Sequence, residues 1–111
     1  MPSISIIICG LFLLSYCKSK NYKSLVDKGG VIVDVRSSEE YAGGHIEGSI
    51  NIPVGDLISR LSELEHYKNI PVITCCASGI RSARAKSILK SNDFEQVHNG
   101  GAWSSLQRNL K

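Results

Sequence analysis

From Lys18 onward, short apolar runs rich in β-branched residues alternate with longer segments in which apolar residues recur at helical spacing. The short runs predict strands at 31–35, 50–52, 71–75 and 94–98. The run at 31–35 is almost continuously apolar, which favours a strand covered on both faces. Strands that alternate with amphipathic segments are typical of the α/β class, in which helices cover a sheet.

Helices are expected between these strands and after the last one. The first begins at Ser37 or Ser38, because a hydroxyl there can cap free amides, and it stops at Gly43. The remaining helices are predicted at 56–67, at 82–91 and, after a turn at 99–101, from about Trp103 onward. Trp103 should anchor this last helix to the core.

Composition limits the chain to one compact domain, because 111 residues with 42% hydrophobic content can form one core but not two. The formal net charge of +3 comes from 13 basic and 10 acidic residues that form no long basic run. We therefore expect no nucleic-acid partner and only a mild preference for small anionic molecules.

The first part of the chain differs from the rest, since residues 4–14 are almost wholly apolar and residues 1–17 carry no charged side chain. The run is too short to cross a bilayer as a helix, which takes about 20 residues, and it matches the hydrophobic region of a secretion signal. Residues 14–17 resemble the cleavage box of bacterial lipoproteins, which predicts lipidation at Cys17. We therefore expect 1–17 to be a signal peptide and the protein to be exported to the bacterial cell envelope or periplasm and anchored to the membrane, rather than cytoplasmic. A plain cleaved signal and an uncleaved membrane-associated segment are the alternatives.

The four cysteines, Cys9, Cys17, Cys75 and Cys76, are spaced neither as a disulfide framework nor as metal ligands, so no metal site is predicted. The adjacent pair inside the domain must therefore serve thiol chemistry or packing. Because neighbouring strand residues point to opposite faces, Cys75 should be a small buried apolar residue that faces away from Cys76.

The segment from Cys76 to Ser82 lies between a predicted buried strand and a predicted helix, where α/β sheets bind their ligands. Loop amides and the helix N-terminus stabilise a thiolate, so the pKa of Cys76 should be low and its thiol reactive. Gly79 allows the loop to close around an anion, and Arg81 adds a fork of donors at the mouth. The hydroxyls of Ser78 and Ser82 can bond to the reacting sulfur or tie the loop.

Several motifs together resemble the rhodanese superfamily in its single-domain form, over about Tyr22 to Leu106. The N-terminal signature is matched by D-V-R at 34–36, G-H-I at 44–46 and I-P at 52–53, the active loop by 76–82, and the closing motif, one residue shorter here, by G-G-A-W at 100–103. A rhodanese domain is therefore predicted over 22–110.

The resemblance implies a central parallel sheet of about five strands with helices on both faces, and a sulfurtransferase that carries a persulfide on Cys76. It assigns substrate binding to Ala77, Ser78, Gly79, Ile80, Arg81 and Ser82, and structural support near the site to Asp34, Arg36 and His45. The implied substrates are a small sulfane-sulfur donor such as thiosulfate and an acceptor such as cyanide, a thiol or a protein cysteine. No metal or organic cofactor is implied.

Two other functions remain open. Related phosphatases and arsenate reductases use a loop one residue longer than the six residues from Cys76 to Arg81, which disfavours that activity here. A non-catalytic sulfur carrier or binding module keeps the same fold, although degenerate members typically lose the cysteine. Ala77 stands where many relatives have a charged or polar residue, which predicts that thiosulfate is a poor substrate.

Overall fold

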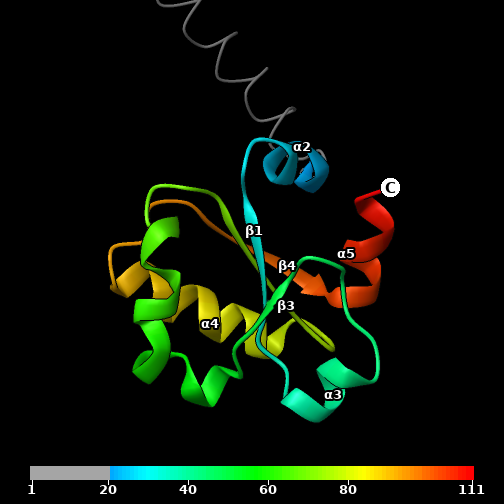
Figure 1. Cartoon of the computed structure of the whole chain (residues 1–111), viewed down its shortest axis with the longest axis horizontal. Helices are drawn as coiled ribbons and strands as arrows, with labels where there is room; N and C mark the ends of the chain where they lie inside the picture. The colour runs from blue at the N-terminus through cyan, green and yellow to red at the C-terminus, as the bar shows by residue number, and fades with distance from the viewer. Residues whose placement is uncertain (1–20) are drawn as a thin grey trace, which may run out of the picture.

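The computed structural model describes residues 21–111, which form an α/β fold (Figure 1). Within these residues the central sheet is parallel and has four strands in the order β2-β1-β3-β4. The strands are β1 (Val31–Asp34), β2 (Ile50–Asn51), β3 (Val72–Cys76) and β4 (Val97–Ala102). The predicted fold class is confirmed, and the four strands observed approximate the expected five.

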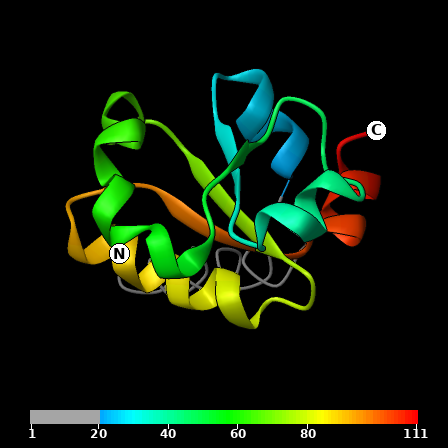
Figure 2. The same cartoon turned by 60° about the horizontal axis from the view of Figure 1, so that its bottom comes forward.

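Helices cover both faces of the sheet, as expected (Figures 1 and 2). They are α2 (Tyr22–Asp27), α3 (Ser38–Ala42), α4 (Ile80–Ser91) and α5 (Trp103–Asn109), with the 3-10 segments η1 (Val54–Asp56) and η2 (Ile58–Tyr67). No helix in residues 21–111 is long and apolar enough to cross a membrane. The predicted leader and Cys17 lie outside the described residues.

The core has two parts, one on each face of the sheet, because alternate strand residues point to opposite faces. The larger part, here called the Cys76 side, contains Val31, Val33, Val35, Ile52, Leu57, Leu64, Val72, Cys76, Ala85, Leu89, Phe94 and Val97. The smaller part, here called the Cys75 side, contains Ile32, Ile46, Ile73, Cys75 and Leu106. Trp103 is partly buried and packs on the Cys75 side, as predicted for an anchor of α5.

The helix predicted over 56–67 is present, but as 3-10 turns rather than as one continuous helix, and it breaks at Arg60, where the backbone is non-helical (φ −117, ψ 17). The break changes the direction of the apolar side chains along the segment. Leu57 and Leu64 are fully buried, whereas Ile58, which the helical pattern placed on the same face, is 68% exposed. The apolar spacing thus identified the buried leucines but not the winding between them.

The last strand also differs from the prediction, since it covers Val97–Ala102 rather than 94–98 and continues through the expected turn at 99–101. The register passes from Thr74 opposite Asn99 to Cys76 opposite Ala102, which is a bulge in β4. Gly100 is needed for close packing, because a β-carbon there would come within 2.8 Å of the Ile73 side chain. This glycine therefore marks a close approach of two strands and not the end of one.

Candidate active site

Cys76 is the last residue of β3 and is fully buried, whereas the sequence pattern placed it in the loop after the strand. The chain leaves the sheet at Ala77, and α4 begins already at Ile80 instead of 82. Gly79, the N-terminal cap of α4, makes this short connection possible because its backbone adopts φ 108, a conformation that favours glycine. The sulfur therefore lies at the carboxyl edge of the sheet, directly before a helix N-terminus.

The Cys76 sulfur is held by a small set of donors, here called the Cys76 cradle, which consists of Ser78, Gly79 and Ser82. The Gly79 amide donates to Sγ at 2.9 Å, and the Ser82 Oγ lies 3.5 Å from Sγ. Burial by itself raises the pKa of Cys76, but the hydroxyl of Ser82 and the amides of Ser82, Gly79 and Ser78 outweigh it and leave that pKa below its usual value. The cradle thus favours a thiolate, the nucleophilic form.

Asn99 braces this cradle from the bulge of β4. Its Oδ1 accepts hydrogen bonds from the Ser82 hydroxyl at 2.6 Å and the Gly101 amide at 3.0 Å, and its Nδ2 donates to the Gly79 carbonyl at 3.2 Å. The Ser82 Oγ also lies 3.0 Å from the Gly79 carbonyl oxygen. A hydroxyl has one proton, so at a given moment Ser82 donates to Asn99, to the Gly79 carbonyl or to the thiolate of Cys76. The sequence did not identify Asn99 as a site residue, because Asn-Gly-Gly is also typical of a turn.

Arg81 does not present a free fork of donors at the mouth of the site. Its Nη1 and Nη2 donate to Oε1 and Oε2 of Glu40 at 2.6 and 3.0 Å, which is a bidentate ion pair between α4 and α3. Both side chains are about one-third exposed, at 37% and 38%. The expected contact of Arg81 with an anionic substrate therefore competes with Glu40.

The other loop residues lie as follows: Ala77, Ser78 and Ile80 are exposed, Gly79 is half-buried and Ser82 is buried. Ile80 is 79% exposed, which makes it one of two large apolar side chains that residues 21–111 leave open to solvent. Substrate binding by residues 77–82 stays a prediction.

Asp34 and Arg36 form a buried ion pair at the end of β1, with Nη2 of Arg36 at 2.7 Å from Oδ2 of Asp34. The hydrogen bond to Asp34 raises the pKa of Arg36, so the guanidinium stays charged. Arg36 also donates to the Gly44 carbonyl at 2.7 Å and lies 4.6 Å from the centre of the Trp103 ring. These contacts tie β1 to the loop after α3 and to α5, and the supporting role assigned to the pair stays a prediction.

His45 is exposed, and its Nδ1 lies 2.8 Å from the carbonyl oxygen of Tyr41, on whose ring it stacks at 3.8 Å between centroids. It thus joins α3 to the chain that follows it. No contact places His45 against Cys76, and its assignment as structural support remains a prediction.

Cys75 faces the opposite side of the sheet and is fully buried among apolar residues. Burial and, after it, the nearby charge of Asp34 raise the pKa of Cys75 to about 12, so this thiol remains neutral at physiological pH. The predicted alternation of the two cysteines is therefore observed.

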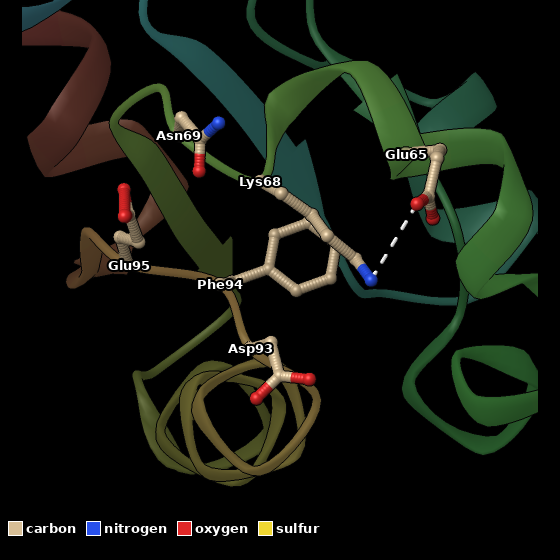
Figure 3. A pocket seen from close by; sticks show the side chains of 6 residues that line it. All are labelled: Glu65, Lys68, Asn69, Asp93, Phe94 and Glu95. Atoms are coloured by element: carbon tan, nitrogen blue, oxygen red, sulfur yellow. Dashed lines mark ion pairs between the residues drawn. The ribbon is translucent and has the colours of Figure 1, made fainter.

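A surface hollow of about 590 Å³ lies where the chain enters β3 and β4, at the end of the sheet opposite to the Cys76 cradle. It is lined by Glu65, Lys68, Asn69, Asp93, Phe94 and Glu95. Figure 3 shows the Phe94 ring beside Lys68, whose amine pairs with Glu65 at 3.5 Å. None of these side chains is a thiol or touches the predicted site, so this hollow is not where the cysteine chemistry takes place.

The site is a buried cysteine whose sulfur accepts a loop amide at the carboxyl edge of a parallel α/β sheet. The chain belongs to the rhodanese-like family, because the sequence signature of the Rhodanese-like domain matches residues 18–105. The resemblance seen in the sequence motifs is thereby confirmed.

Three curated relatives show the range of proteins in which this domain occurs. The chain is 35% identical over 89 residues to the tRNA uridine(34) hydroxylase of Buchnera aphidicola subsp. Baizongia pistaciae, covering 76% of this chain and 28% of that protein. It is 36% identical over 74 residues to the thiosulfate sulfurtransferase PspE of Escherichia coli, covering 67% and 71%. It is 41% identical over 68 residues to the putative sulfur carrier protein YrkF of Bacillus subtilis, covering 61% and 36%. The chain thus spans about a quarter of the hydroxylase and about a third of the carrier protein.

Solved structures give the same result. A rhodanese with anions from E. coli superposes with a TM-score of 0.63 at 33% identity, covering 68% of this chain and 88% of that one. The human single-domain sulfurtransferase TSTD1 superposes with a TM-score of 0.66 at 28% identity, covering 78% and 80%. These two neighbours are themselves small proteins of which this chain spans most.

Proposed function

We propose that this protein is a sulfurtransferase that moves a sulfane sulfur from a small donor to a thiophilic acceptor through a persulfide on Cys76. The observation that carries the proposal is that the Cys76 sulfur accepts a hydrogen bond from the Gly79 amide at 2.9 Å and that the pKa of Cys76 is lowered. A donor arrangement that stabilises a thiolate also stabilises the terminal sulfur anion of a persulfide, which bears the same charge. The named activity of the relative PspE supports the same reaction class.

The first half-reaction is a displacement at sulfur. The Cys76 thiolate attacks the outer sulfur of a donor such as thiosulfate, a new S–S bond forms, and the donor S–S bond breaks. Sulfite leaves with the bonding electron pair, so the charge before and after the step is equal. The product is a Cys76 persulfide anion within the cradle.

The second half-reaction returns the thiolate. An acceptor nucleophile attacks the outer sulfur of the persulfide, and Cys76 leaves as the thiolate, which the cradle again stabilises. Cyanide takes the sulfur as thiocyanate, and a thiol or protein cysteine takes it as a new persulfide. The attack by the Cys76 thiolate needs no general base, whereas an acceptor thiol loses its proton to solvent before it attacks the persulfide.

The alternative is a sulfur carrier, in which the persulfide forms but passes on only to one dedicated partner. The similarity to a putative sulfur carrier protein keeps this function open. Multiple turnover with a small acceptor separates the two, because a carrier without its partner releases sulfur stoichiometrically or not at all. A phosphatase or arsenate reductase is disfavoured by the six-residue loop from Cys76 to Arg81.

Intact-mass spectrometry after incubation with thiosulfate tests the proposal. We expect one reducible one-sulfur adduct, mapped to Cys76 by peptide analysis, and its loss on addition of cyanide with formation of thiocyanate. The matched variant Cys75→Ala should still form the adduct. An adduct on another cysteine, or no adduct with any sulfane-sulfur donor, would contradict the proposal.

We also propose that residues 1–17 direct export and that Cys17 anchors the mature chain, on the basis of the uncharged apolar leader. Cell fractionation and mass spectrometry of the purified protein test this. A mature N-terminus at Cys17 with an acyl group, in the membrane fraction, is expected. Full-length protein that begins at Met1 in the cytosol would contradict it.

A further inference from the structure

Arg81 lies in the first turn of α4, one residue before Ser82 of the Cys76 cradle, and forms an ion pair with Glu40 of α3. Both guanidinium Nη atoms are engaged by the two carboxylate oxygens, at 2.6 and 3.0 Å. Arg81 is close enough to the reacting sulfur for the charge of Cys76 to raise the pKa of Arg81, after the larger effect of its hydrogen bond to Glu40. The net charge of the Arg81–Glu40 pair therefore acts electrostatically at the Cys76 sulfur, which the sulfur donor must approach.

Glu40 is held in place independently of Arg81. The Glu40 Oε1 accepts a hydrogen bond from the Ser37 amide at 3.0 Å, and the Glu40 amide donates to the Ser37 hydroxyl at 3.2 Å. These two bonds form a capping box at the start of α3. Hydrogen bonds from Arg81 first and Ser37 second lower the pKa of Glu40 to about 2, so the carboxylate is charged at every pH used for assays.

The loop offers no second cation. Of the seven residues from Cys76 to Ser82, only Arg81 has a basic side chain, and the others are Cys76, Ala77, Ser78, Gly79, Ile80 and Ser82. Because Arg81 is paired with Glu40, the side chains of the loop and Glu40 have a net charge of zero. The thiolate of Cys76 then adds one negative charge. A doubly charged donor therefore gains no compensation from a side-chain charge for its repulsion by the thiolate of Cys76.

We infer that Glu40 is a specificity-determining residue: by cancelling the charge of Arg81, it makes the site favour singly charged sulfane-sulfur donors over the thiosulfate dianion. This inference rests on the proposed sulfurtransferase function. Ala77 had already suggested a weak response to thiosulfate, and Glu40 supplies a separate electrostatic reason for it.

Two donors with the same reacting sulfur separate charge from chemistry. Thiosulfate is a dianion and releases sulfite, whereas methanethiosulfonate is a monoanion and releases methanesulfinate. In both cases the thiolate of Cys76 attacks the outer sulfur, one S–S bond forms, one breaks, and the leaving group takes the electron pair. The ratio of kcat/KM for the monoanion to that for the dianion, measured on one enzyme sample, is independent of how much of that sample is folded.

Three variants set the net charge of the pair to +1, −1 and zero, and a fourth is a control outside the pair. Glu40→Gln leaves a charge of +1 and keeps the α3 cap, because a glutamine oxygen can accept the Ser37 amide. Arg81→Gln leaves −1, and the double variant Glu40→Gln with Arg81→Gln returns the pair to zero. Glu39→Gln makes the same change of total charge one residue away, on a side chain that forms no ion pair within residues 21–111.

We expect the monoanion-to-dianion ratio to fall about fivefold in Glu40→Gln and to rise about fivefold in Arg81→Gln at low salt. The double variant and Glu39→Gln should keep the wild-type ratio. An unchanged ratio in Glu40→Gln, or an equal fall in Glu39→Gln, overturns the inference while the sulfurtransferase function stands. Absence of a Cys76 persulfide with both donors in the wild type would instead overturn the proposed function, and the inference with it.

Discussion

Strand β3 ends with two neighbouring cysteines that face opposite sides of the sheet, and a comparison of these sides shows what makes a thiol reactive. Both cysteines are fully buried, so exposure does not distinguish them. On the Cys75 side the thiol is surrounded by apolar side chains and lies near the carboxylate of Asp34, and its pKa rises to about 12. On the Cys76 side burial also raises the pKa of the thiol, but the hydrogen-bond donors of the cradle lower the pKa of Cys76 by more.

The difference between the two sides comes from the way the chain continues after each residue. Cys75 is followed by one more strand residue, so the amides next to it serve the sheet. Cys76 is followed by a three-residue connection whose amides curl back onto the sulfur, because Gly79 permits the required turn. The reactive thiol is therefore defined by converging N–H groups, and the hollow of about 590 Å³ at the other end of the sheet shows that volume alone does not define a site.

The largest effect should come from removal of the Cys76 thiol. Cys76→Ser should reduce thiosulfate:cyanide turnover by about a thousandfold or more, because a serine hydroxyl is not ionised near neutral pH. Steady-state thiocyanate formation measures this. Turnover within tenfold of the wild type would mean that another nucleophile carries the sulfur.

The stability of Cys76→Ser tests whether Cys76 is part of the packed core. The sequence pattern placed Cys76 in a loop, where a substitution would leave stability nearly unchanged. Because Cys76 is fully buried in the Cys76 side of the core, we now expect Cys76→Ser to cost about 1 kcal/mol of unfolding free energy. Denaturant melts of the variant and the wild type measure the cost.

The next effect concerns the cradle. After burial, which acts in the opposite direction, the Ser82 hydroxyl is the largest influence on the pKa of Cys76. Ser82→Ala should raise that pKa by about one unit, since a hydrogen bond to a charged group contributes about 1.5 kcal/mol or more. The pH dependence of Cys76 alkylation measures the shift, which loss of stability alone would not produce.

Ser87→Ala is the matched control, because Ser87 is an exposed residue of the same helix whose hydroxyl lies 3.4 Å from the Ala83 carbonyl. Its alkylation profile should superimpose on that of the wild type. A Ser82→Ala profile that also superimposes would show that the Ser82 proton stays with Asn99 or the Gly79 carbonyl and does not reach the thiolate.

The smallest effect is expected on the other side of the sheet. Cys75→Ala should keep sulfur transfer and lose on the order of 1 kcal/mol of stability, the cost of a small cavity behind β3. Turnover tests the retained sulfur transfer, and thermal melting of the same preparation tests the loss of stability. Loss of turnover without a change of melting temperature would give Cys75 a chemical role and would break the comparison.

The features that the sequence predicted well are those encoded in short segments. The strand before Cys76, the loop up to Ser82 and the capped start of α3 each depend on neighbouring residues, and each is observed within about two positions. Alternation along one strand was enough to separate the two cysteines. The family follows from several such segments together.

The features that the sequence missed depend on contacts between distant residues. Glu40 and Arg81 are 41 positions apart, and Asn99 and Ser82 are 17 apart, so no local pattern reveals either contact. Asn99 was assigned to a turn because the bulge that directs it toward the cradle follows from the packing of Gly100 against Ile73. The 3-10 winding of η2 was missed for a similar reason, since a helical repeat of apolar residues does not specify which helix buries them.

The most direct test of the account is a pH series of alkylation on the folded wild-type protein, with peptide mapping that resolves all four cysteines. Because the thiolate is the reactive form, the rate at each cysteine follows its deprotonated fraction. We expect Cys76 to react with a midpoint clearly below the value of about 8.5 for an ordinary cysteine, and Cys75 to remain unmodified in the same samples until the protein is denatured. A Cys76 midpoint at or above that of an ordinary cysteine, or equal labelling of Cys75 and Cys76 in the folded protein, would contradict the account.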